Sequence, residues 1–414
     1  MQNGSHEDVG RGFYRIAGAA AYHLASYSAL AFSLISQRPE NANLSPAEEA
    51  LAHLILRDLA GLGRRARTWL LNPAHGDANI SQALRAGEID SDDAVRLIAT
   101  STIFRALAFF EFALQTGAAV LIEESRSLLR RAISLARNAN AVSLWWTGRI
   151  VLNLIDDLWS SSLHQVLPLD GPAGAGIYQD LRQLFIGELF GRDVAEVELW
   201  PSQIEAARRA TDMTDDLVVA LPTSAGKTRI AEIAALMALA ARRRVLIVTP
   251  LRALSAQTER SFRRTFSSLG FSVSSLYGAA GAAGGDEDAL RTQDIVIATP
   301  EKLDFALRND PSIIDDVGLV VLDEGHLIGP SEREIRYENL VQRLLRRADN
   351  ETRRIVCLSA ILPEGDQLND LTAWIRSDAG GTPIQSRWRP TRQRFGTLMW
   401  QGNSARLSFD LEAG

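Results

Sequence analysis

Cysteine and lysine are almost absent from this chain of 414 residues. Because Cys357 is the one cysteine, the chain can form no internal disulfide and no zinc site built from cysteines. It stands in the apolar run 355–358, which predicts a buried strand residue rather than a reactive thiol. Lys227 and Lys302 are the only lysines, and a GC-rich genome accounts simply for this bias towards arginine.

An excess of positive charge and a clear membrane segment are also missing. The formal net charge is −6, so a nucleic-acid path would have to be a local groove. The most apolar stretch, 102–122, carries Arg105 and Glu111, and a charge at mid-bilayer costs roughly 2.5–3.5 kcal/mol. Residues 1–15 are polar and lack the apolar core of a secretory signal. We therefore expect a cytoplasmic protein that does not enter a membrane.

The first part of the chain has the periodicity of helices. Apolar residues recur at three- and four-residue spacing through about 11–165, as in 50–59 and 128–135. Ser45-Pro46 followed by Glu48 is typical of a helix start. We expect an all-α N-terminal domain over 1–170, followed by a linker and connecting helix over 171–194, because residues 168–176 are rich in proline and glycine.

The pattern changes after about residue 195, where short β-branched runs alternate with helical segments. This alternation predicts a parallel sheet with functional groups at the carboxyl ends of its strands. The expected strands are 217–221, 245–249, 272–276, 295–299, 319–323 and 355–359. The fold expected for the chain is an α-helical domain followed by an α/β domain over 195–385.

The first predicted strand leads into a phosphate-binding loop, Pro-Thr-Ser-Ala-Gly-Lys-Thr at 222–228. Gly226 permits close approach of the backbone to phosphate, Lys227 reaches the β- and γ-phosphates, and the Thr228 hydroxyl ligates magnesium. The strict pattern fails because Leu221 stands at the first glycine. The strand before the loop and the helix expected after it, 229–241, support the assignment.

A second predicted strand ends in paired carboxylates, Asp323 and Glu324. Adjacent side chains at a strand end point to opposite sides, so the two acids can take different roles. Asp323 can hold magnesium, and Glu324 can orient and deprotonate an attacking water. Together with the loop at Lys227, this pair predicts an ATP hydrolase.

These motifs resemble those of superfamily 2 helicases of the DExH-box type, and the sub-pattern is similar to the Ski2-like branch. Further segments fit in the family's order over roughly 195–365. Trp200-Pro201-Ser202-Gln203 resembles the glutamine motif, Pro250-Leu251-Arg252-Ala253-Leu254 with Gln257 resembles motif Ia, Thr299-Pro300-Glu301-Lys302-Leu303 resembles motif Ib, and Ser359-Ala360-Ile361 resembles motif III. The usual third residue of motif III is threonine.

The resemblance implies a RecA-like domain, that is, a P-loop NTPase fold, using ATP and Mg²⁺. The implied ATP contacts are Trp200, Gln203, Thr223, Ser224, Ala225, Gly226, Lys227 and Thr228. The Gln203 amide has the donor and acceptor that the adenine edge requires. Trp200 can pack on the base or serve as a core aromatic. Arg252 and Thr299 are implied to contact nucleic-acid phosphates, and His326 and Ser359 to couple the two sites.

The resemblance also implies a second RecA-like lobe that supplies an arginine finger. No motif of that type follows Ser359, so we interpret 386–414 as the start of a linker to a lobe that this chain lacks. The expected activity is ATP-dependent translocation or unwinding, DNA-directed by resemblance.

Two alternatives stay open: an RNA substrate, and a nucleotide-gated module that binds nucleic acid or protein. A nuclease within the chain is disfavoured, because both lysines already lie in helicase motifs. The helical front with a Ski2-like domain is similar to helicase subunits of bacterial anti-phage systems of the Hachiman type. That resemblance implies a separate nuclease or other defence subunit as partner.

Overall fold

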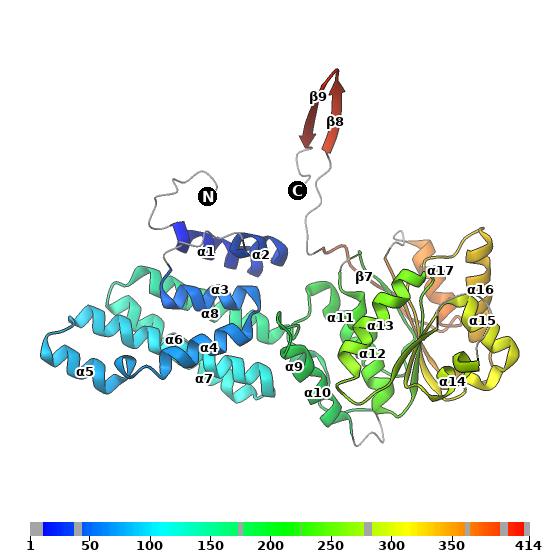
Figure 1. Ribbon diagram of the computed structural model, residues 1–414, viewed down its shortest axis with the longest axis horizontal. Helices are drawn as coiled ribbons and strands as arrows, with labels where there is room; N and C mark the ends of the chain where they lie inside the picture. Colours follow the sequence, from blue (N-terminus) through cyan, green and yellow to red (C-terminus); the bar gives the residue numbers. More distant parts are fainter. Residues whose placement is uncertain are drawn as a thin grey trace.

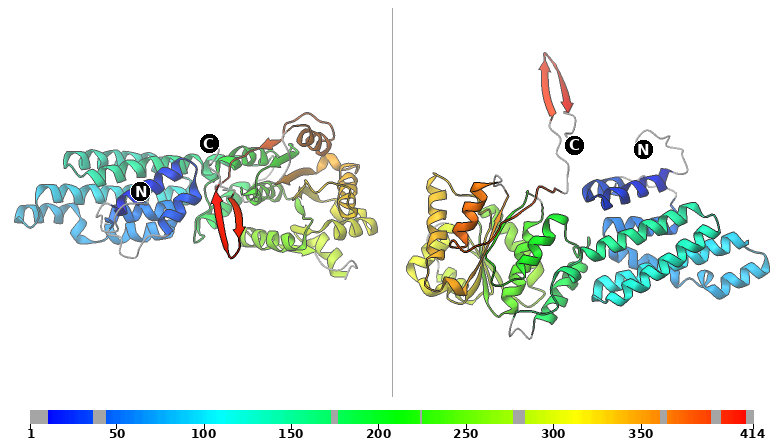
Figure 2. Two further views of the ribbon diagram at one scale, coloured as in Figure 1. Left: turned by 90° about the horizontal axis from the view of Figure 1, so that it is seen from above. Right: turned by 180° about the vertical axis from the view of Figure 1, so that it is seen from behind.

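The computed structural model describes residues 11–36, 44–172, 177–223, 225–276, 284–360, 365–389 and 396–409. A helical region is joined end to end with an α/β region, which gives an elongated molecule (Figure 1). Views from above and from behind show the same division (Figure 2). The expected fold, a helical N-terminal part followed by a parallel-sheet domain, is confirmed.

The helical region is built from hairpins of neighbouring helices. Its elements are α1 (Arg11–Leu24), α2 (Ser28–Ser36), α3 (Pro46–Leu56), α4 (Leu59–Leu70), η1 (Pro73–His75), α5 (Asp77–Ala86), α6 (Ser91–Thr116), α7 (Ala119–Asn138), α8 (Val142–Ser160), α9 (Leu163–Val166) and α10 (Tyr178–Phe190). The start predicted for α3 is confirmed, because Ser45 and Glu48 form a reciprocal capping box with Pro46 in the first turn.

Helix α6 contains most of the chain's most apolar stretch. By length and composition alone it could cross a membrane, yet 61% of its most apolar window is buried inside the protein. It packs against α4 and α7, and Phe104 and Phe110 on it are fully buried. The packing is that of a central core helix.

The α/β region has a 7-stranded, all-parallel sheet in the order β3-β4-β2-β5-β6-β1-β7. The strands are β1 (Leu217–Ala220), β2 (Arg244–Val248), β3 (Val273–Leu276), β4 (Ile295–Ala298), β5 (Val317–Leu322), β6 (Arg354–Ser359) and β7 (Ile384–Gln385). The six strands predicted from the sequence are confirmed to within two residues at each end. The two-residue strand β7 is an addition.

Helices cover both faces of this sheet. They are α11 (Pro201–Ala210), α12 (Lys227–Ala240), α13 (Arg252–Phe266), α14 (Gly284–Thr292), α15 (Pro300–Asn309), η2 (Pro311–Ile314), α16 (Glu332–Leu345), η3 (Asn350–Thr352) and α17 (Asp366–Ile375). Alternate strand residues face opposite layers: Val219 packs towards α11–α13, whereas Val218 packs towards α15–α17. Because both faces are buried, the strands are continuous apolar runs.

One apolar core extends from the helical region to the α11–α13 face of the sheet. Helix α10 makes the connection, since it packs against α6 on one side and against α12 and α13 on the other. Phe185 on α10 is fully buried, with its ring centroid 6.1 Å from that of Phe266 on α13. The helical region therefore contacts the helix that follows the phosphate loop.

The last described segment is an antiparallel hairpin of β8 (Gly396–Gln401) and β9 (Ser404–Phe409). It stands away from both regions (Figures 1 and 2). Large apolar side chains on it are more than half exposed, namely Leu398, Met399, Trp400 and Leu407. Leu398 is paired with Leu407, and Trp400 lies two residues after Leu398, so these three side chains share one uncovered apolar face, whereas Met399 lies on the other face.

Candidate nucleotide site at the carboxyl edge of the sheet

The loop between β1 and α12 has the backbone conformation that a close approach to phosphate requires. Gly226 is the N-cap of α12 with φ of +79°, a left-handed conformation that favours glycine. A Cβ at this position would lie 2.0 Å from the Gln203 Nε2. Lys227 is the first residue of α12, whose N-terminal N–H groups attract phosphate. Of the other predicted contacts, Thr223 and Thr228 are exposed, Ala225 is buried, and Ser224 lies outside the described residues.

Gln203 lies beneath this loop and is almost fully buried. Its Nε2 donates to the Gly226 carbonyl at 2.8 Å, and its Oε1 accepts from the Trp200 N–H at 2.8 Å. The Trp200 ring lies 5.5 Å from that of Trp388, centroid to centroid. The amide therefore holds the glycine of the loop, and its predicted contact with adenine remains a prediction.

The paired acids follow β5 at the same edge of the sheet. The Asp323 N–H donates to the Val248 carbonyl at 2.9 Å, and the Gly325 N–H donates to the Leu358 carbonyl at 2.8 Å, so the turn is tied to β2 and β6. Glu324 has φ of +50°, an uncommon conformation for a residue other than glycine. Such strain, of order 1–3 kcal/mol, is found where a side chain must be aimed at a site.

The acids and the lysine of the loop influence one another electrostatically. Burial and the neighbouring Glu324 charge raise the pKa of Asp323 to about 6, and Lys227 opposes this rise. Burial lowers the pKa of Lys227, whereas the charges of Glu324 and Asp323 raise it. The fold has thus brought Lys227 close to two adjacent acids that lie about a hundred residues later in the sequence.

The arrangement fits a divalent cation. Asp323 is a partly buried carboxylate whose pKa is raised by burial and by the Glu324 charge, and the Glu324 Oε2 is buried without a hydrogen-bond partner among the described residues. Carboxylate and hydroxyl oxygens are the ligands that Mg²⁺ prefers. Asp323 is therefore suited to hold Mg²⁺, and the contact of Thr228 with the ion stays a prediction.

The predicted coupling residues lie in the same place. His326 Nδ1 lies 3.4 Å from the Glu324 Oε2, and burial lowers the pKa of His326. Ser359 ends β6, next to β1, where its hydroxyl is buried without a partner in the described chain. Unpaired buried polar atoms such as these are costly unless a ligand or water satisfies them.

Sequence reasoning missed Tyr337 on α16, which lies behind the acidic turn. Its hydroxyl is buried and has no described hydrogen-bond partner. Burial raises its pKa well above the usual range, and the charges of Asp323 and Glu324 act in the same direction. A single tyrosine in an amphipathic helix carries no signal that would distinguish it from a core residue.

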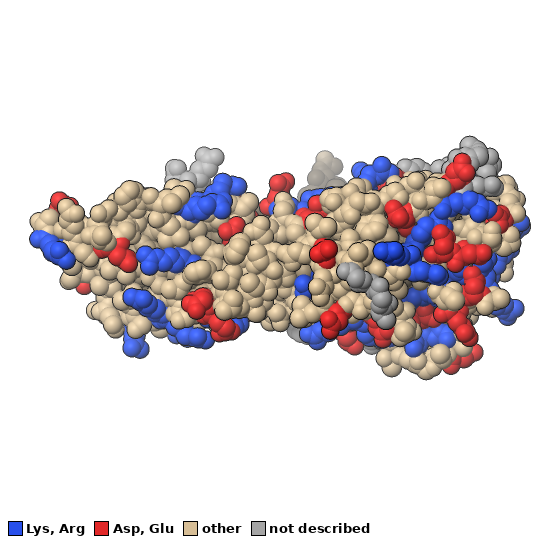
Figure 3. Space-filling model, turned by 90° about the horizontal axis from the view of Figure 1, so that it is seen from below, with Lys and Arg blue, Asp and Glu red and all other residues tan. Residues whose placement is uncertain are grey.

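The predicted nucleic-acid residues follow adjacent strands of this edge. Arg252 is exposed as the first residue of α13, after β2, and Thr299 caps α15 after β4. Thr299 is only 4% exposed, so a phosphate could reach its hydroxyl only after a local rearrangement. On the face seen in Figure 3, charges of both signs are mixed over the α/β half. That face shows no continuous basic track.

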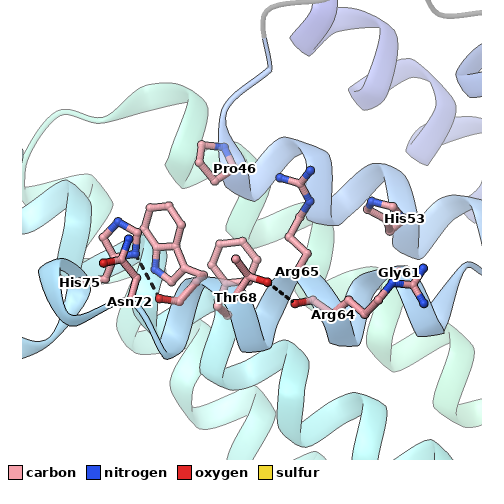
Figure 4. Close-up of a pocket in the computed structure, with 10 residues that line it drawn as sticks. Pro46, His53, Gly61, Arg64, Arg65, Thr68, Asn72 and His75 are labelled. Atoms are coloured by element: carbon pink, nitrogen blue, oxygen red, sulfur yellow. Dashed lines mark hydrogen bonds between the residues drawn. The ribbon is translucent and has the colours of Figure 1, made fainter.

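A separate cavity of about 430 Å³ lies between α3, α4 and η1 of the helical region (Figure 4). Its polar groups are largely occupied: Arg65 pairs with Glu49, and the His53 Nδ1 lies 2.8 Å from an Asp58 carboxylate oxygen. The ring of Trp69 is stacked between those of His75 and Phe104, at 3.7 and 5.2 Å. A base therefore has no free face of Trp69 on which to stack.

Gly325 is the position in the acidic turn with the least room. A Cβ there would lie 2.2 Å from the Cys357 Sγ. We expect Gly325→Ala to destabilise the fold by about 1–3 kcal/mol through overpacking. Adding Cys357→Ala should recover part of the loss, because it removes the atom that clashes. Thermal unfolding of both single variants and the double variant measures this coupling; strictly additive losses would contradict the predicted contact.

Comparison with known proteins agrees with this geometry. Residues 200–369 match the family of DEAD/DEAH box helicases. The chain is 30% identical over 303 residues to the Hachiman protein HamB of Bacillus cereus, covering 72% of this chain and 26% of that protein. It is 36% identical over 206 residues to the ATP-dependent DNA helicase Hel308 of Pyrococcus abyssi, covering 50% of this chain and 26% of the relative.

The Hel308 of Thermococcus kodakarensis is 33% identical over 214 residues, covering 49% of this chain and 17% of that helicase. The chain thus spans about a quarter or less of the length of these relatives. Residues 200–369, which match the helicase family, contain the phosphate loop, the acidic turn and strands β1 to β6. Residues 200–369 of this chain are therefore a DEAD/DEAH box helicase domain, and the chain is similar to both Hel308 and HamB.

Proposed function

We propose that this chain is part of an ATP-dependent helicase or translocase that acts on DNA. The observation that supports this most strongly is the strand order β5-β6-β1, which brings the phosphate loop and the paired acids to one sheet edge on either side of Ser359. The proposed catalytic residues are Lys227, Asp323 and Glu324. ATP turnover measured with single-stranded DNA, duplex DNA and RNA tests this proposal.

In the proposed mechanism the phosphates lie against the N-terminus of α12. Lys227 balances charge on the β- and γ-phosphates, and Asp323 with Thr228 holds Mg²⁺, which neutralises developing phosphate charge when bound. Glu324 aligns the attacking water and accepts its proton, since its Oε2 makes no hydrogen bond to the described residues and lies 3.4 Å from the His326 Nδ1. His326 contacts Glu324, so a change at Glu324 during hydrolysis can move His326 and thereby affect the proposed nucleic-acid residues Arg252 and Thr299.

Two alternative functions make different predictions in the same assay. Stimulation by RNA alone favours an RNA helicase. Turnover that neither nucleic acid stimulates favours a nucleotide-gated binding module. The DNA assignment is supported by the likeness to two ATP-dependent DNA helicases.

We also propose that full turnover needs a second RecA-like lobe, because the family resemblance implies an arginine finger from such a lobe. The exposed apolar side chains of the β8–β9 hairpin support this proposal, because another domain would cover them. The proposed divisions of the chain are a helical domain 1–170, a connection 171–194, a first lobe 195–385 and a linker 386–414. Limited proteolysis with and without ATP tests these boundaries.

The likeness to a Hachiman protein supports a role in antiviral defence with a nuclease or other subunit as partner. We place this complex in the cytoplasm. Phage infection of cells with wild-type protein or with a Lys227 variant tests the role. Equal protection by the two would contradict it.

Gln203 offers a test of base recognition. We expect Gln203→Ala to weaken ATP binding by about tenfold and GTP binding less. In the variant the polar groups of the adenine edge would lose the Gln203 amide as a partner, and a buried polar group left unpaired costs about 1–3 kcal/mol. Competition by ATP and GTP against a labelled nucleotide measures both affinities. If Gln203 only supports the Gly226 carbonyl, the two affinities will fall equally.

A further inference from the structure

The segment between α10 and α11, residues 191–200, which we call the strap, contacts both halves of the molecule. Backbone hydrogen bonds attach it to the helical region. The Ala195 N–H donates to the Arg57 carbonyl at 3.1 Å, and the Leu163 N–H donates to the Val197 carbonyl at 2.8 Å. The strap is therefore an ordered part of the helical region's surface rather than a loose linker.

A buried ion pair strengthens this attachment. Arg57 is 6% exposed and binds Glu198 of the strap through two hydrogen bonds, Nε to Oε1 at 2.9 Å and Nη2 to Oε2 at 2.8 Å. Two parallel bonds of this kind fix orientation as well as distance. Arg57 is the C-cap of α3, so movement of that helix end is transmitted to the strap.

Two residues earlier, the strap contacts the helix of the phosphate loop. The Glu196 carboxylate pairs with Arg229, which lies two residues after Lys227, and with Arg192 at 2.7 Å. Arg229 also pairs with Glu232 at 2.5 Å, and the Glu232 side chain is only 2% exposed. Removing one partner of so buried a pair is strongly destabilising, because it leaves the other charge buried and uncompensated.

Glu232 extends the network to the helix that begins with Arg252. Its Oε1 accepts from the Ser261 hydroxyl at 3.1 Å and from the Thr265 hydroxyl at 2.9 Å, both on α13. Thr265 in turn accepts from Arg192 of the strap at 2.8 Å. The strap, α12 and α13 are thus joined in one closed ring of hydrogen bonds.

The strap's far end holds the other side of the loop. It ends at Trp200, whose N–H is bonded to Gln203, and Gln203 donates to the Gly226 carbonyl. The residues before and after Lys227 therefore both depend on the strap, Gly226 through Gln203 and Arg229 through Glu196. A change in the loop therefore acts on the strap through the buried Gln203 amide on one side and, on the other, through the Arg229–Glu196 ion pair, whose glutamate is 39% exposed.

We infer that the strap couples the nucleotide loop to the helical region, so that nucleotide binding changes the contact between the strap and the end of α3. Coupling of this kind is reciprocal, so a ligand of the helical region would alter nucleotide affinity by the same factor. Glu196 is the positioning residue between α12 and the strap, and Glu198 is the positioning residue between the strap and the end of α3. The inference rests on the proposed function only in that the loop must bind a nucleotide.

Amide hydrogen exchange with and without a non-hydrolysable ATP analogue and Mg²⁺ tests the inference. In wild type we expect the analogue to slow exchange at least tenfold in three places: the phosphate loop, strap residues 195–199 and the α3 end at 54–58. Glu196→Gln should keep the protection of the loop and lose the other two. Glu198→Gln should keep loop and strap protection and lose only that of α3.

Asp193→Asn is the matched control, because Asp193 is an exposed acid of the same strap, and it should behave as wild type. Protection of the wild-type loop with an unchanged strap would overturn the inference and leave the proposed function intact. Strap protection that survives in Glu196→Gln would overturn it as well. A wild-type loop without any protection would contradict nucleotide binding itself, and the inference would fall with it.

Discussion

Replacing Lys227 by alanine is expected to reduce ATP turnover by about 10²–10³-fold. The structure places the Lys227 ammonium so that its charge acts on both Asp323 and Glu324 at the loop, and preorganised charge on a transferred phosphoryl group is worth this much. Turnover should be measured in the full-length protein under nucleic-acid stimulation, with nucleotide affinity measured separately.

Arg130→Ala is a suitable control for this loss of a basic side chain. Arg130 is exposed on α7 of the helical region, away from the sheet edge. It should retain wild-type turnover and the same unfolding temperature as the Lys227 variant. Normal hydrolysis by Lys227→Ala would show that the loop does not serve as the phosphate site.

Glu324→Gln should stop hydrolysis while leaving nucleotide binding almost unchanged. The amide has the shape of the carboxylate and can occupy the same left-handed backbone position, but it cannot accept a proton from water. Loss of a general base costs about 10²–10⁴-fold in rate. Affinity for ATP with Mg²⁺ should change by less than about threefold, because Asp323 and Lys227 are intact.

The comparison variant is Glu338→Gln, an exposed acid on α16. It tests whether removal of a negative charge from the surface of a neighbouring helix is sufficient to reduce turnover, and we expect no effect. Binding and single-turnover rate measured on the same samples separate affinity from chemistry. A Glu324→Gln protein that binds poorly but hydrolyses what it binds would refute the role of Glu324 as a base.

The sequence by itself determined the elements of the catalytic domain. Apolar β-branched runs that alternate with helical segments are typical of a parallel sheet buried on both faces, so the strands and their carboxyl-end motifs were predictable. The glycine before Lys227 and the acids after β5 were predictable for a different reason: the chemistry of each motif depends on residues that are neighbours in the chain. The helix start at Ser45 was equally local, since capping requires only neighbouring residues.

Contacts between distant segments were decided by the tertiary structure. The sequence contains Gln203 and Gly226 but not their hydrogen bond, and it contains Glu196 and Arg229 but not their ion pair. Such pairs depend on the angle at which α10, α11 and α12 pack, which many side chains set together. A local pattern identifies a chemical group, whereas burial and packing determine which partner that group has. The phosphate loop is thus a property of the sequence, and its connection to the helical region is a property of the fold.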